Sequence, residues 1–336
     1  MSVIADVAKL AGVSKSTASR ALSGGGYVSQ ETREKVLAAA AELGYSASPI
    51  ATSLVTGRTK NVGVMIPFFA RWFFGEVLEG IEARLRAHGY DMTVYNVHPG
   101  PRGDEVLGDI IARRRFDGII IVAIDPDEHD VARLLDTGRP VVGIGGPISR
   151  LATIAVDDVG IARMATEHLL RLGHTDVVHL GGDSSERADF SVPRKRRTGY
   201  EEAMAEAGLG ERARTLEVEM SIPAGYEAGI DVLSDPRRRP TALFAACDEL
   251  AVGAIIAARR LGIAVPGELS VIGIDGHECA AMFSLTTIEQ APREQGTAVV
   301  DLLLRAIDTG ESPDGVTYLP TRLRVRNSTS RLIPAP

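Results

Sequence analysis

The stretch from Ile4 to Arg20 reads IADVAKLAGVSKSTASR and predicts two short helices joined by a tight turn. Its first half repeats apolar residues at positions i, i+3, i+4 and i+7, which gives one helix a single apolar stripe. Gly12 suits the left-handed backbone on which helices often end, and Ser14 can cap the amide groups that open the next helix. This is the pattern of a helix-turn-helix, a unit that places a helix in the major groove of DNA.

The second predicted helix has a small apolar inner face and a polar outer face. Its outer face presents donors that can reach base edges or phosphates, namely Lys15, Ser16, Ser19 and Arg20. A third helix, expected between a cap at Ser29 and a stop at Gly44, completes a three-helix headpiece. The alternative is that three short amphipathic helices form a structural subdomain that never touches DNA.

A family resemblance favours the DNA-binding alternative. The segments DVAKLAGVSKSTASRAL and VSQETREKVLAAAAELGY resemble the headpiece of the LacI/GalR family of bacterial transcription regulators. The resemblance implies that Lys15, Ser16 and Arg20 read bases in the major groove. It also implies that Thr17 and Ser19 fix the helix on the DNA backbone.

Charge is unevenly distributed along the chain. The first 60 residues contain seven Lys and Arg against four Asp and Glu, which gives +3; since the whole chain carries −7, the remainder carries −10. A small basic module on an acidic body suits a protein that approaches DNA through one end, with an affinity that falls as salt rises.

Residues 46–60 are expected to be a hinge and linker, because Ser, Thr, Pro and Gly concentrate there and apolar periodicity nearly vanishes. Ile50, Ala51 and Leu54 could form one helical turn, too short to be stable alone. In the family that this segment resembles, such a turn orders on DNA, and Leu54 matches the leucine that wedges into the minor groove. The alternative is a passive flexible tether.

From residue 61 onward, short apolar strands alternate with amphipathic helices, which predicts parallel sheets covered on both faces. Eight strands are expected, at Val62–Ile66, Met92–Asn96, Gly118–Val122, Val141–Ile144, Val177–Leu180, Leu216–Glu219, Ala242–Ala246 and Val271–Ile274. Eight strands exceed one compact doubly wound unit of ordinary size.

Several function classes lack their sequence signatures. The body contains no Walker phosphate loop, zinc-binding His-Glu-x-x-His helix or Gly-x-Ser-x-Gly elbow, so we expect no enzyme activity. The seven histidines and two cysteines show no metal-ligand spacing, and neither a metal nor a cofactor is expected.

The resemblance to the LacI/GalR family continues through the body, in segments such as VGVMIP, RRRFDGIIIV, ACDELAVGAI and SVIGIDG. It implies an all-α headpiece at 1–45, the hinge and linker at 46–60, and an α/β effector-binding domain at 61–330 with a periplasmic-binding-protein-like fold. One of its two doubly wound parallel-sheet lobes would comprise about 61–156 and 290–319, and the other about 157–289 and 320–330.

The resemblance also implies an effector site in the cleft between these lobes. Asp275 and Arg196 match the family's ligand-binding aspartate and arginine, a pair that suits a polyhydroxylated ligand because both make charge-assisted hydrogen bonds. Phe73 could stack on the apolar face of a sugar. Three further candidates fall at pocket positions of the family or replace residues there, namely Arg71, Met220 and Cys247.

Each of these residues also has a purely structural interpretation. Asp275 could cap a helix, Arg196 could belong to the solvated basic run Arg194–Arg197, and the aromatic side chains could be ordinary core. His277 is expected to be a loop residue rather than a ligand group.

Together these features predict a homodimeric repressor that binds a pseudo-palindromic operator in double-stranded DNA and is controlled by a small-molecule effector, expected to be a carbohydrate. A corepressor-dependent regulator with a non-sugar ligand remains an alternative, as does a sugar-binding protein without a DNA role. No apolar run is long enough to span a bilayer and no signal peptide precedes the headpiece, so we expect a cytoplasmic protein without membrane contact.

Overall fold

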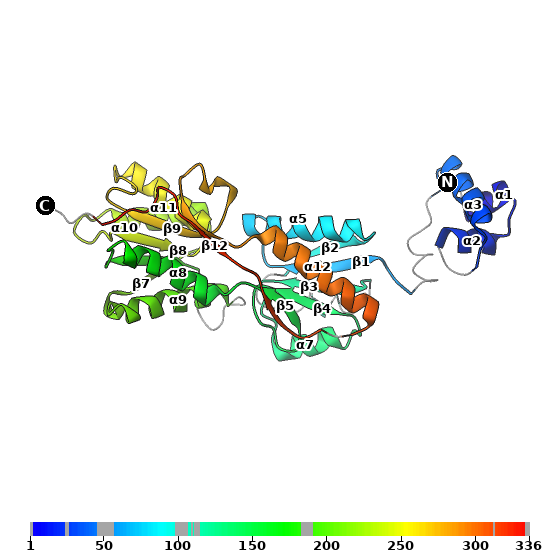
Figure 1. The fold of residues 1–336 in the computed structure, drawn as a ribbon, viewed down its shortest axis with the longest axis horizontal. Coiled ribbons are helices and arrows are strands. Elements are labelled where there is room, and N and C mark those ends of the chain that lie inside the picture. The colour runs from blue at the N-terminus through cyan, green and yellow to red at the C-terminus, as the bar shows by residue number, and fades with distance from the viewer. Residues whose placement is uncertain are drawn as a thin grey trace.

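The computed structural model describes residues 3–23, 27–45, 57–97, 107–108, 110, 115–182, 191–311 and 313–332. The N-terminal headpiece consists of α1 (Ile4–Leu10), α2 (Lys15–Ser23) and α3 (Gln30–Glu42). Its three helices pack on one small core, at whose centre Val7, Ala18 and Val36 are fully buried. In Figure 1 the headpiece lies beyond one end of the α/β body.

Local capping explains where these helices begin. The Ser14 hydroxyl accepts from the backbone N–H of Thr17 at 3.1 Å, and the Ser29 hydroxyl accepts from that of Thr32 at 3.3 Å. Gly12, between α1 and α2, has the positive φ of +68° that favours glycine in a tight turn. The predicted helix-turn-helix is therefore built as its sequence indicates.

The first lobe has a six-stranded parallel sheet with the order β11-β5-β4-β3-β1-β2. Its strands are β1 (Asn61–Ile66), β2 (Asp91–Asn96), β3 (Gly118–Val122), β4 (Val141–Ile144), β5 (Ala152–Ala155) and β11 (Gly315–Tyr318). Helices α5 (Trp72–Ala87) and α12 (Pro292–Thr309) pack on one face. Helix α7 (Glu128–Leu135) packs on the other face.

The second lobe has a six-stranded sheet with the order β12-β10-β9-β8-β6-β7. Its strands are β6 (Val177–Gly181), β7 (Arg214–Glu217), β8 (Ala242–Ala245), β9 (Ser270–Asp275), β10 (Thr286–Glu289) and β12 (Arg322–Arg324). Its helices are α8 (Asp158–Arg171), α9 (Val192–Glu206), α10 (Ile222–Leu233) and α11 (Asp248–Arg260), with short turns η1 (Gly210–Arg212) and η2 (Glu278–Ala280). The edge strand β12 runs antiparallel to β10, so this sheet is not purely parallel as predicted.

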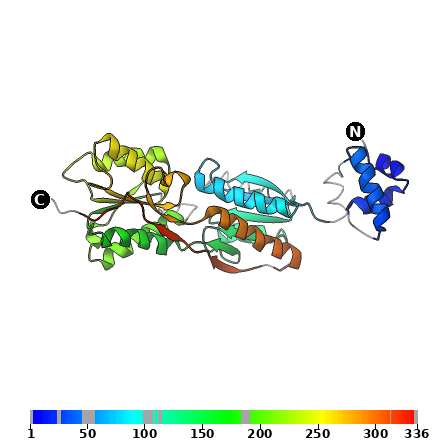
Figure 2. The same cartoon turned by 45° about the horizontal axis from the view of Figure 1, so that its top comes forward.

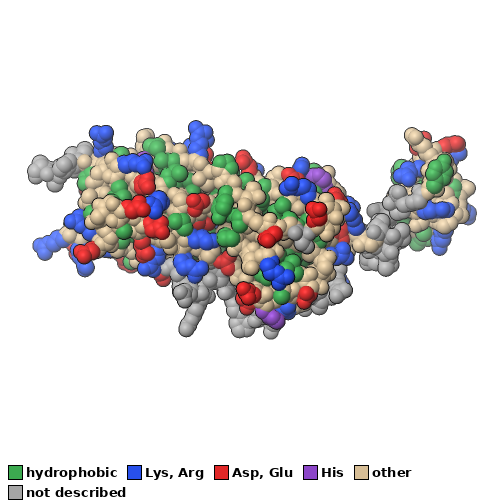
Figure 3. Space-filling view, turned by 60° about the horizontal axis from the view of Figure 1, so that its bottom comes forward, with side chains coloured by type: hydrophobic (Ala, Val, Ile, Leu, Met, Phe, Trp, Pro, Cys, Tyr) green, Lys and Arg blue, Asp and Glu red, His purple; other side chains and the backbone are tan. Residues whose placement is uncertain are grey.

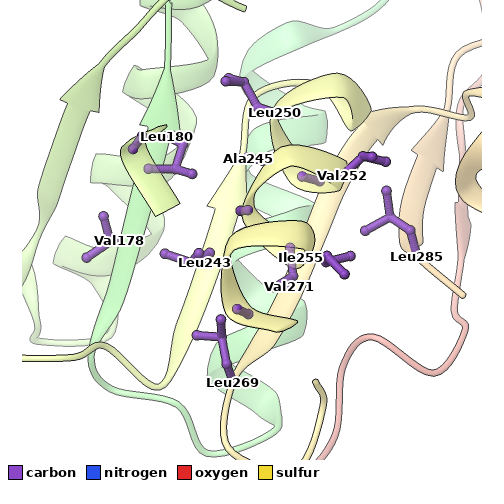
Figure 4. Close-up of a cluster of buried hydrophobic side chains, with 14 of the residues drawn as sticks. Val178, Leu180, Leu243, Ala245, Leu250, Val252, Ile255, Leu269, Val271 and Leu285 are labelled. Carbon is purple, nitrogen blue, oxygen red and sulfur yellow. The ribbon is translucent and has the colours of Figure 1, made fainter. Parts of the chain in front are cut away.

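The core of the second lobe is divided between its two sheet faces. Figure 4 shows one half, in which leucine, valine and isoleucine side chains of α11 meet those of β6, β8 and β9. Helices α8 and α9 bury the opposite face around Tyr200 and Phe244, both fully inaccessible to solvent. With helices on both faces, each lobe is doubly wound, as the alternating pattern predicts.

The two lobes lie end to end, and the chain passes between them three times (Figures 1 and 2). The passages lie between β5 and α8, between β10 and α12, and between β11 and β12. Since each lobe is assembled from separate stretches of chain, neither is a contiguous segment of the sequence.

All eight expected strands are present, and the strands that were missed are only three or four residues long. Four strands, β5, β10, β11 and β12, were not predicted, and β7 begins at Arg214 rather than the expected Leu216. The side chains of β7 and β11 are half-buried or exposed, so hydrophobic pattern does not mark their register. None of the described helices has the length and apolar character of a bilayer-spanning segment.

Candidate functional sites

The outer face of α2 carries all five candidate DNA-contacting residues of the headpiece. Lys15, Ser16 and Arg20 are exposed, while Thr17 and Ser19 are half-buried against the headpiece. The Arg20 side chain donates through Nε to the Ser16 carbonyl at 3.2 Å. The residues expected to read bases are thus exposed, whereas those expected to contact the DNA backbone are half-buried. Leu54 lies outside the described residues.

A cavity of about 240 Å³ lies between the two lobes and is lined by side chains from both. It sits at the carboxyl ends of strands, where open α/β sheets bind their ligands. The residues predicted from sequence that line it are Arg71, Phe73, Arg196, Met220, Cys247 and Asp275. All six predicted pocket residues therefore meet at one place, although they come from distant parts of the chain.

Buried charged and polar groups form a network that runs along the cavity from the second lobe to the start of α12 in the first lobe. Arg196, only 4% exposed, donates through Nε to Asp158 Oδ1 at 2.9 Å and lies 3.7 Å from Asp275 Oδ1. Gln290, at a passage between lobes, donates to the same Asp275 oxygen at 2.5 Å, and Gln295 donates to the Gln290 carbonyl at 2.7 Å. The position of Arg196 excludes the interpretation that it belongs to a solvated basic run.

Burial sets the protonation behaviour of this network. It raises the pKa of Asp275 to about 7, against the opposing effect of Arg196 and the Gln290 hydrogen bond. Burial also raises the pKa of Asp158, again opposed by Arg196. The pKa of the Cys247 thiol lies well above its ordinary value for the same reason, so Cys247 contributes a neutral thiol to the cavity wall.

The strand end that carries Asp275 adopts an unusual backbone. Asp275 has φ of +130° and is followed by Gly276 at +74°. A second buried carboxylate, that of Asp248 at the start of α11, accepts hydrogen bonds from the His277 N–H at 2.8 Å and from the Thr287 hydroxyl at 2.7 Å. These bonds fix the turn after β9 and therefore the direction of the Asp275 side chain.

Much of the first-lobe wall of the cavity comes from the turn before α5 and from its first residues. The Arg71 guanidinium donates through Nη1 to the Met220 carbonyl at 2.7 Å and lies 3.2 Å from Glu219. Phe73 meets the Phe74 ring edge-on, with centroids 5.4 Å apart. His277 does not line the cavity, and it accepts a hydrogen bond from the Cys279 N–H at 2.9 Å, as a loop residue would.

Sequence reasoning missed five polar residues of the cavity wall, namely Asp158, Glu219, Glu249, Gln290 and Gln295. Asp158 and Gln290 follow strands β5 and β10, which the hydrophobic pattern did not mark. Glu249 follows a strand that was predicted, so its place just after a strand end was an available signal.

A helix-turn-helix headpiece joined to a two-lobed α/β body with a cavity between its lobes is the architecture of a DNA-binding transcription regulator. The family model "Bacterial regulatory proteins, lacI family" matches residues 3–48, and that of the periplasmic binding protein-like domain matches residues 166–329. The chain belongs to the LacI family of bacterial transcription regulators, which are DNA-binding proteins rather than enzymes.

Relatives match along almost the whole chain. The HTH-type transcriptional repressor PurR of Vibrio campbellii is 32% identical, with 99% of this chain and 100% of that protein covered. The HTH-type transcriptional regulator DegA of Bacillus subtilis is 33% identical, with 98% of each covered. Among solved structures, the lac repressor dimer bound to operator and the anti-inducer ONPF has a TM-score of 0.85 at 28% identity, with 98% of this chain and 99% of that chain covered.

Proposed function

We propose that this protein is a repressor whose dimer binds a pseudo-palindromic operator through its two α2 helices. The observation that carries the proposal is the exposed outer face of α2, on which Lys15, Ser16 and Arg20 are accessible to base edges. Thr17 and Ser19, set lower on that face, contact phosphates, and Leu54 of each hinge enters the minor groove between the half-sites.

The effector in this proposal is a small hydroxylated molecule, most simply a sugar, held in the cavity between the lobes. Buried Asp275 and Arg196 offer an acceptor and a donor for neighbouring hydroxyl groups, and Phe73 offers a ring edge or face to apolar C–H groups. Related folds with bound sugars support this class: the regulator CelR was solved with cellobiose, and an Enterococcus faecium family member with ribose.

The described arrangement of the lobes is, in this proposal, the operator-binding one. In support, the operator-bound lac repressor chain, compared over headpiece and body together, matches with a TM-score of 0.85, whereas the cellobiose complex of CelR reaches 0.68 over an equal share, 98%, of this chain. An effector that favours another arrangement would then release the operator and act as an inducer. The protein would work in the cytoplasm, where its operator lies.

Domain limits follow the same proposal, with a headpiece at 1–45, a hinge at 46–60 and an effector domain at 61–330. The two lobes would be bounded at the passages near residues 156, 290 and 320.

Fluorescence anisotropy with the DNA upstream of the protein's own gene tests the headpiece assignment. We expect the intact chain to bind, and a truncated chain that begins at Asn61 not to bind. Arg20→Ala should lose about 1–3 kcal/mol of base discrimination, whereas Lys9→Ala, which removes an exposed cation from α1, should have little effect. Equal binding by the intact and truncated chains would reject the proposal.

A thermal-shift screen over mono- and disaccharides tests the effector site. A ligand at 100 times its Kd should stabilise the wild type by about 2.7 kcal/mol, and Asp275→Asn should abolish that gain. A screen in which only non-carbohydrate compounds stabilise the protein would favour the corepressor alternative.

A further inference from the structure

Two adjacent residues at the start of α5 reach from the first lobe to the second. Figure 1 shows this end of α5 at the junction between the lobes. Arg71 contacts the segment after β7, and Trp72 contacts the segment after β9. Both target segments belong to the second lobe, so a single turn of the first lobe holds two strand ends of the other.

The Arg71 guanidinium is fixed on both sides. It lies over the Phe68 ring of its own lobe, 4.2 Å from the ring centroid, and its side chain is only 18% exposed. From there it donates to the Met220 carbonyl at 2.7 Å and pairs with Glu219 at 3.2 Å. A partly buried, charge-assisted bond of this kind is stronger than an exposed ion pair, so the Met220 bond is the main link.

Trp72 makes the second link through its ring. Its indole stacks on the His277 imidazole with centroids 4.6 Å apart and an interplanar angle of 29°. His277 is held in turn, because its N–H donates to the buried Asp248 and its ring accepts from the Cys279 N–H. His277 lies two residues after Asp275, so the stack touches the same strained turn that positions the proposed ligand-binding aspartate.

We propose that Arg71 and Trp72 form an interlobe clasp that holds the two lobes in the described arrangement. The clasp couples two events, because Arg71 lines the cavity while Trp72 presses on the turn that carries Asp275. A ligand that engages Arg71 competes with the Met220 carbonyl for the guanidinium and so loosens the clasp. The consequence for operator binding rests on the proposed function; the clasp itself does not.

The chain's single tryptophan is Trp72, so its fluorescence reports the clasp directly, without DNA or effector. In the wild type we expect Trp72 to be protected from acrylamide. Arg71→Ala and His277→Ala should each raise the Stern–Volmer quenching constant and shift the emission to longer wavelength. His277→Phe, which keeps a ring opposite Trp72, should restore protection.

Arg84→Ala is the matched control, because Arg84 lies on the same helix and its ion pair with Asp301, at 2.6 Å, stays within the first lobe. Far-UV circular dichroism checks that each variant is folded. The two variants His277→Ala and His277→Phe test the Trp72 stack while the Arg71 contacts stay intact. If the quenching constants of Arg71→Ala and His277→Ala both equalled that of Arg84→Ala, the clasp would be overturned.

Operator anisotropy then separates the clasp from the proposed function. If the described arrangement binds DNA, Arg71→Ala should weaken operator binding about fivefold or more relative to Arg84→Ala. Increased quenching with unchanged operator affinity would confirm the clasp and reject the assignment of this lobe arrangement to the operator-bound state.

Discussion

Arg196 and Arg197 are neighbours in sequence with opposite environments. Arg196 is buried with Asp158 and Asp275, whereas the Arg197 side chain is 41% exposed and pairs with Glu201 and Glu217 on the surface. In the sequence both belong to one basic run, so composition alone does not distinguish them. The side of α9 on which each residue lies decides which becomes part of the cavity.

This difference predicts unequal costs of substitution. Arg196→Ala leaves two buried carboxyl groups without their cation and should destabilise the body by about 3–5 kcal/mol. Arg197→Ala removes partly exposed surface ion pairs and should cost less than about 1 kcal/mol. Urea unfolding followed by circular dichroism measures both. Comparable costs would contradict the buried network.

At the scale of elements, the helices that cover the sheets pack in pairs through glycine. In the first lobe, a Cβ at Gly80 of α5 would overlap the carbonyl oxygen of Arg293 in α12, and one at Gly296 would overlap that of Val77. In the second lobe, Gly199 of α9 and Gly253 of α11 approach the partner helix in the same way. Close backbone approach, rather than turn geometry, requires glycine at these positions.

Helix α5 offers a test with its own control. Gly80→Ala should destabilise the protein by about 1–3 kcal/mol, because the added methyl group forces α5 and α12 apart. Gly75 lies on the same helix, and a methyl group there would meet no atom within 4 Å, so Gly75→Ala should stabilise the protein by up to about 1 kcal/mol through helix propensity. Thermal unfolding of both variants gives the sign of each effect, and a neutral Gly80→Ala would rule out the tight crossing.

At the scale of the whole molecule, charge divides the protein into a basic end and an acidic body. On the face shown in Figure 3, acidic and basic side chains are interspersed over the two lobes rather than gathered by sign. The division lies instead in the net charges, because residues 1–60 carry +3 and the remainder of the chain carries −10. Such a distribution orients the protein toward DNA by its headpiece.

The charge distribution predicts a strong salt dependence of operator binding. A dimer that neutralises 6–10 phosphates should lose about 10³–10⁵ in affinity between 50 and 200 mM salt. Effector binding in the cavity between the lobes should change far less over this range, because buried pairs are weakly screened. Anisotropy and calorimetry at several salt concentrations compare the two, and a flat operator curve would contradict phosphate-driven binding.

Local sequence determined the parts of this protein that depend on neighbours in the chain. The headpiece helices follow from the spacing of their apolar residues and from the caps Ser14 and Ser29. The central strands follow from mostly apolar runs that need burial on both faces of the sheet. Family resemblance added the pocket candidates Arg196 and Asp275. Strands β5 and β12 were missed, because a threonine interrupts the apolar run of β5 and two of the three residues of β12 are arginine.

Only the tertiary structure decided which of these residues meet. Arg196 and Asp275 are separated by nearly 80 positions in the chain. They are buried in one network because Asp158 accepts from Arg196 and Gln290 donates to Asp275. The contacts of Arg71 and Trp72 with the second lobe were equally invisible in sequence. The physical reason is that the chain passes three times between lobes, so the cavity and the clasp depend on how two separately folded sheets are placed against each other.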